Sequence, residues 1–90
     1  MLQAEDYKKL VTEIITKQID ILGPDMAVRR AKNVAGLEVR DDGTVVAIQG
    51  DPDTVLRELV DQYITLSGQI VKNILGPIFA KYPDVKFDLK

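Results

Sequence analysis

Four aspartates are the side chains best placed to carry chemistry in this chain. Asp41 and Asp42 are adjacent, and Asp51 and Asp53 are separated by a single proline. Paired carboxylates can bind a divalent cation or act as general acid and base. The spacing of an EF-hand loop is missing, however, and each pair has a structural use in a turn or a helix N-cap. We therefore interpret them as turn and cap residues and expect no catalytic or metal site.

Several other chemistries are excluded by composition. The chain has no histidine and no cysteine, which rules out the common zinc sites and the Ser–His and Cys–His nucleophilic pairs. Its single serine, Ser67, falls on the apolar side of an expected helix. Glycine-rich phosphate loops of the Walker or dinucleotide type are also missing. We expect no enzyme and no cofactor.

A short cationic segment supports an alternative function. A helix, a Gly-Pro turn, a basic helix and a β-hairpin together resemble in outline the middle of a winged helix-turn-helix. In that alternative the major groove would be contacted by Arg29, Arg30, Lys32 and Asn33. The expected hairpin tip carries Asp41 and Asp42, where a wing needs positive charge near phosphate. We therefore do not expect nucleic acid as a partner.

Overall composition describes an ordinary small globular protein. Ninety residues fit one domain over 1–90, and the hydrophobic content of 46% is sufficient for a core. The net charge of −2 gives no general attraction to nucleic acid or to an anionic membrane. No apolar run approaches the ~20 residues that span a bilayer, and the first residues lack the pattern of a secretory signal. We expect a cytoplasmic protein, in the general style of small prokaryotic regulatory or adaptor domains.

The first half of the chain predicts two helices and a hairpin. Apolar residues recur every three or four positions over 4–22, and Gly23-Pro24 should end that helix. A second helix is predicted over 24–35, with a glycine at its C-terminal end. Residues 37–49 predict a β-hairpin whose turn places Gly43 at a positive φ.

The second half predicts one long helix, then a strand. Asp51-Pro52 is a strong helix start, and helical spacing continues over 52–75. Gly76-Pro77 either kinks or ends this helix, with a short fourth helix beyond it. The last eight residues, 83–90, alternate as a strand does. The expected fold class is α+β and mainly helical, in the order α-α-β-hairpin-long α-(short α)-β, with a small antiparallel sheet against a helical layer.

The predicted long helix is the reason to expect self-association. At 1.5 Å per residue a helix over 52–75 measures ~36 Å, whereas a compact domain of this size is only ~30 Å across. A mid-helix glycine costs about 1 kcal/mol, so Gly68 beside Ser67 suggests a close helix crossing. The predicted interface comprises Leu56, Leu59, Tyr63, Ser67, Gly68, Ile70, Val71 and Ile74.

The sequence thus favours a non-enzymatic, self-associating protein-interaction or regulatory domain. Its expected partner is a second copy, as a homodimer or higher oligomer, and another protein is also possible. Two alternatives stay open: a dimeric DNA-binding regulator of winged-helix type, and a catalytically inert subunit of a larger enzyme complex.

Overall fold

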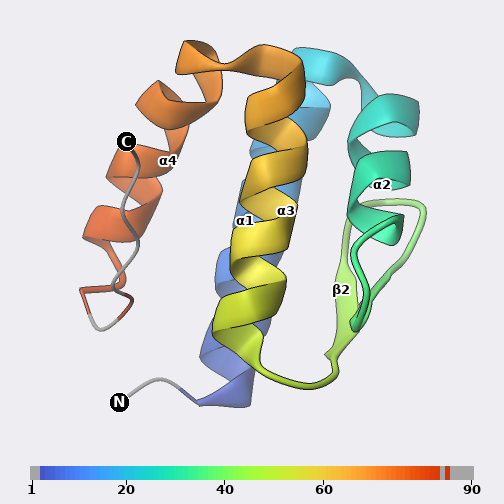
Figure 1. Ribbon diagram of the computed structural model, residues 1–90, viewed down its shortest axis with the longest axis vertical. Helices are drawn as coiled ribbons and strands as arrows, with labels where there is room; N and C mark the ends of the chain where they lie inside the picture. Colours follow the sequence, from blue (N-terminus) through green and yellow to red (C-terminus); the bar gives the residue numbers. More distant parts are fainter. Residues whose placement is uncertain (1–2, 84, 86–90) are drawn as a thin grey trace.

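Helices dominate the computed structural model, which describes residues 3–83 and 85. Its elements are α1 (Ala4–Leu22), α2 (Pro24–Lys32), β1 (Leu37–Val39), β2 (Val45–Ile48), α3 (Pro52–Ser67) and α4 (Gln69–Ala80). The expected class, mainly helical α+β with a small antiparallel sheet, is confirmed. In Figure 1, α1 lies behind α3, with α2 and the hairpin on one side of this pair and α4 on the other.

The corner between α1 and α2 follows its local sequence. Gly23 ends α1 and Pro24 begins α2, as predicted. α2 ends at Lys32, three residues before the predicted end. Asn33 and Val34 donate their N–H groups to carbonyls three residues earlier, at 3.2 and 3.1 Å. These short-range bonds tighten the last turn and end the α-helical pattern.

The β-hairpin is fastened to α1 at its turn. Gly43 has φ +92°, as predicted, and donates its N–H to the Arg40 carbonyl at 2.9 Å. A Cβ atom at Gly43 would lie 2.8 Å from Cδ1 of Ile19, so the turn packs closely on α1. The Val45 N–H donates to Oγ1 of Thr12 on the same helix at 3.1 Å. The strand register is Leu37–Ile48, Glu38–Ala47 and Val39–Val45, with a bulge at Glu38/Val39.

The single helix predicted over 52–75 is wrong. α3 ends at Ser67, Gly68 has φ +59° and ψ −122°, and α4 turns back beside α1 (Figure 1). These dihedrals lie far from helical values and suit glycine alone. The expected overhang disappears with the break, because the longest dimension of the protein is 32 Å. Pro77 neither ends nor separates a helix, since α4 continues through it to Ala80.

The core is enclosed mainly by α1 and α3, with contributions from α2, the hairpin and α4. Tyr63 is fully buried and donates its hydroxyl hydrogen to the Ala27 carbonyl at 2.7 Å, which joins α3 to α2. Burial raises the pKa of Tyr63 well above its usual range. None of the helices in the described part of the chain is long and apolar enough to cross a membrane.

The predicted C-terminal strand falls largely outside the described residues. Residues 84 and 86–90, with Phe87 and Leu89, are among those not described. Val85 is described, is 8% exposed and joins the core without belonging to a strand. Its N–H donates to the Tyr82 carbonyl at 2.9 Å, so the chain turns directly after α4.

Candidate self-association surface

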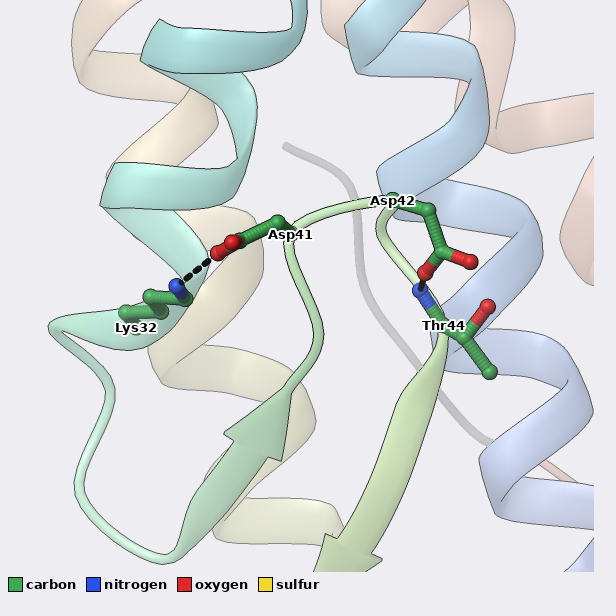
Figure 2. Close-up of polar contacts among 4 residues, drawn as sticks. All are labelled: Lys32, Asp41, Asp42 and Thr44. Atoms are coloured by element: carbon green, nitrogen blue, oxygen red, sulfur yellow. Dashed lines mark hydrogen bonds and ion pairs between the residues drawn. The ribbon is translucent and has the colours of Figure 1, made fainter.

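The aspartates considered for catalysis or metal binding have structural partners. Asp42 accepts the Thr44 N–H at 2.9 Å, and this hydrogen bond holds the pKa of Asp42 below its usual value (Figure 2). Asp51 accepts the Asp53 N–H at 3.2 Å and the Thr54 hydroxyl at 3.0 Å. The interpretation of Asp42 as a turn residue and of Asp51 as an N-cap is confirmed.

Asp53 also serves to join two helices. The Tyr7 hydroxyl of α1 donates to Oδ1 of Asp53 in the first turn of α3 at 2.9 Å. Burial and this hydrogen bond both raise the pKa of Tyr7. Within residues 3–83, no group of three or more carboxylates gathers closely enough to hold a metal ion. The geometry around Asp53 therefore serves to position α3 against α1.

The cationic residues of the DNA-binding alternative share the outer face of α2 with acidic ones. Arg29, Lys32 and Asn33 line a shallow pocket of about 430 Å³ that also contains Asp25 and Asp41. Figure 2 shows the side chains of Lys32 and Asp41 pointing toward one another, with Nζ 2.5 Å from Oδ1. Arg30 is half-buried. Carboxylates inside a cationic pocket repel phosphate, so this geometry does not favour a nucleic-acid backbone.

The residues predicted to form an interface separate into two groups. The side chains of Leu56, Leu59, Tyr63 and Val71 belong to the protein's own core, at 1% exposure or less. Ser67, Gly68 and Ile74 are half-buried, and Ile70 is 55% exposed. The structure therefore places Ile70 and Ile74 on a flank of α4 next to its buried side, with Ile74 partly packed against the core, and leaves the others on the inner side or in the turn.

One flank of α4, next to its buried side, is apolar and partly exposed. Lys72 is the only charged residue in this helix. Ile70, Ile74 and Pro77 are spaced by four and then three residues, so they lie along one side, and all three retain exposure. The side of α4 opposite its buried residues carries Gln69, Asn73, Gly76 and Ala80, so the apolar surface is wider than the buried stripe but does not encircle the helix. We define Ile70, Ile74 and Pro77 as the α4 stripe.

A groove runs beside the α4 stripe, between α4 and α1. Its volume is about 580 Å³, and Ile74, Pro77 and Ile78 contribute apolar lining. The Lys81 ammonium pairs with the Glu13 carboxylate, so one ion pair links the C-terminal end of α4 to α1. The groove thus marks where α4 and α1 meet at the surface of the protein.

Three features were not predicted from the sequence. Gly68 was interpreted as a helix-crossing residue rather than as a turn, although a glycine after a serine in a helical pattern does signal a break. The side chain of Gln18 is fully buried on α1, and neither its amide nitrogen nor its oxygen has a hydrogen-bond partner among the described residues. The pair of Glu13 with Lys81 spans 68 positions, so no local pattern indicates it.

The geometry defines a small helical α+β domain whose last described helix leaves an apolar stripe partly exposed on one flank. No protein-family model matches the chain, and no curated protein or solved structure shows a significant match to it. The surfaces of the chain itself are therefore the basis for assigning a function.

Proposed function

We propose that this protein is a non-enzymatic, self-associating interaction domain that uses α4 to bind a second copy. The α4 stripe carries the proposal. Ile70 is the most exposed large apolar residue in the described part of the chain, at 55%, and it lies on a helix with a single charge. Covering such a surface contributes about 25 cal/mol per Å² of apolar area, which favours association.

The polar residues support a binding role over a catalytic one. Asp42 and Asp51 each accept a hydrogen bond within their own turn or helix start, and Asp53 accepts one from the Tyr7 hydroxyl of α1. The chain has neither histidine nor cysteine, so Ser67 has no histidine base to activate it and the Cys–His type of nucleophile is missing. A domain without catalytic residues acts by binding other chains, and this mode of action fits a regulatory role.

Sedimentation equilibrium over a micromolar concentration range tests the proposal. The wild-type protein should approach twice the chain mass of 10.0 kDa as concentration rises. Ile70→Lys should weaken association at least about tenfold, or ~1.4 kcal/mol, because it places a charge in the apolar contact. A wild-type protein that stays monomeric throughout contradicts the proposal.

Val46→Lys is the matched control, because Val46 is similarly exposed, at 42%, but lies on the hairpin. This variant should leave the association constant unchanged. An equal loss from Val46→Lys and Ile70→Lys would place the interface elsewhere than on α4. Retention on DNA that falls steeply with salt would instead favour the alternative of a DNA-binding regulator.

A further inference from the structure

The connection between α3 and α4 is a single residue. α3 ends at Ser67 and α4 begins at Gln69, so Gly68 alone reverses the chain direction. The Gly68 N–H donates to the Ile64 carbonyl at 2.8 Å, while its own carbonyl accepts from the Val71 N–H at 3.2 Å. Two helices are thus joined through one backbone position whose dihedrals decide whether the chain folds back or continues.

The spacing of buried residues in the two helices continues across this position at intervals close to the helical repeat. Their inner residues Leu59, Tyr63, Val71 and Leu75 are separated by multiples of four, and Ser67 occupies the step between them. Helical dihedrals at Gly68 would therefore merge residues 52–80 into one helix of ~43 Å at 1.5 Å per residue. Because four residues turn an α-helix by about 40° more than one full turn, its inner side chains would follow a stripe that winds gradually around the helix. The same periodicity made a single helix the natural expectation from sequence.

Opening the hinge at Gly68 would separate α4 from the rest of the chain and expose a surface that is complementary to α4. In the closed chain, Val71, Leu75 and Ile78 of α4 are buried in the common core, and Lys81 pairs with Glu13 of α1. An open chain exposes this face of α4 and also the surface of α1 and α3 that α4 covered. The α4 of a second open copy matches that surface in shape and charge, because it is the same segment.

We propose that two copies of this chain associate by exchanging α4, with Gly68 as the hinge. The exchange rests on the self-association proposed above and specifies how it occurs. In the exchanged form, each α4 makes with the partner chain the contacts that it makes within its own chain in the closed form. The two forms therefore differ in conformation only at the hinge. Two antiparallel helices over 52–80 then cross near Gly68, and Ile70, two residues away, lies next to the crossing.

Three variants, two at the hinge and one control in α4, test the exchange through the dissociation constant of the dimer. Gly68→Ala disfavours the closed turn, since alanine avoids φ +59° with ψ −122°, and it favours a continuous helix. A bias of about tenfold at each of two hinges tightens the dimer about a hundredfold. Gly76→Ala is the control, because Gly76 is helical in both forms and has open space around it. Its dimer constant should stay unchanged.

Gln69→Pro should have the opposite effect. Residue 69 is the first of α4, where proline is well tolerated in the closed chain. In a continuous helix the same proline would be interior and would clash with the preceding turn, so we expect dimerisation to weaken at least about a hundredfold. If Gly68→Ala loosens the dimer or Gln69→Pro leaves it intact, the hinge is not at Gly68 and the exchange is wrong.

A zero-length cross-link distinguishes exchange from simple contact in the wild-type protein. A carbodiimide can convert the Glu13–Lys81 ion pair into an amide bond, and both side chains are partly exposed. Light and isotope-labelled chains are unfolded, refolded together and cross-linked. Exchange predicts mixed light–heavy peptides containing Glu13 joined to Lys81. The Lys32–Asp41 pair is the internal control, because it lies outside α4 and should join only within one chain.

The outcomes separate the two proposals. A dimer whose Glu13–Lys81 link is always within one chain keeps the self-association and refutes the exchange. A protein that remains monomeric, with Gly68→Ala also monomeric, refutes both. A dimer with mixed links establishes that α4 is exchanged between copies.

Discussion

Gly43 in the hairpin turn provides the sharpest test of how the hairpin is held. Gly43→Ala combines two costs. At φ +92° an alanine is strained by about 1–2 kcal/mol. Its Cβ would also lie 2.8 Å from Cδ1 of Ile19 and 3.2 Å from Cγ2 of Ile15 on α1. Because the nearer atom is the end of a flexible side chain, we expect the lower range of overpacking costs, about 1 kcal/mol. The total loss of stability should be about 2–3 kcal/mol.

Gly50→Ala is the matched control for backbone strain. Gly50 has φ +83°, and no atom lies within 4 Å of the position that a Cβ would occupy there, so only strain of about 1–2 kcal/mol applies. Urea unfolding of both variants gives the difference directly, provided that the m-values agree. For a domain of this size, each kcal/mol corresponds to a change in Tm of about 4–8 °C.

A double-mutant cycle isolates the contact between the turn and α1. In an Ile19→Ala background the crowding atom is gone, so the extra cost of Gly43→Ala should fall by about 1 kcal/mol. Equal losses for Gly43→Ala and Gly50→Ala, with no coupling to Ile19, would refute the close packing of the turn on α1.

Two further predictions concern buried polar groups. Gln18→Met should stabilise the protein by about 1–2 kcal/mol in urea unfolding, because it replaces a buried, unpaired amide by an apolar chain of similar length; a loss of stability would show that the amide has a partner. Tyr63→Phe should cost about 1 kcal/mol through the lost bond to the Ala27 carbonyl. Because the pKa of Tyr63 is raised in the folded protein, its contribution to the free energy of unfolding is intact below pH 10 and is lost as the pH rises toward the folded pKa. The loss of stability at alkaline pH should therefore be smaller in the phenylalanine variant.

The sequence alone determined the elements that depend on neighbouring residues. Gly23-Pro24 ends one helix and begins the next, and Asp51-Pro52 starts α3 with the predicted side-chain cap. Gly43 occupies the positive φ of the hairpin turn. These signals act within about four residues, through caps, fixed proline dihedrals and glycine freedom, so they can be read without knowing the rest of the fold.

The break at Gly68 illustrates what local patterns left open. The inner residues of α3 and α4 are separated by multiples of four, which is close to the helical repeat, so Tyr63, Val71 and Leu75 predict one helix as well as they predict two. Half of the residues predicted for an interface, Leu56, Leu59, Tyr63 and Val71, consequently belong to the protein's own core. Periodicity reports which side of a helix is buried, but not which surface buries it.

Only the tertiary structure decided how distant segments meet. The N–H of Val45 at the start of β2 donates to Thr12, Lys81 at the end of α4 pairs with Glu13 of α1, and Gln18 is buried despite its polar side chain. Each of these contacts depends on how α4 and the hairpin pack on α1. The free energy gained there by burying apolar area outweighs the local conformational preference of any single residue. The sequence therefore determined by local chemistry where α1 ends and where α2 and α3 begin, while the break at Gly68 and the return of α4 onto α1 were decided by the core that the two helices share.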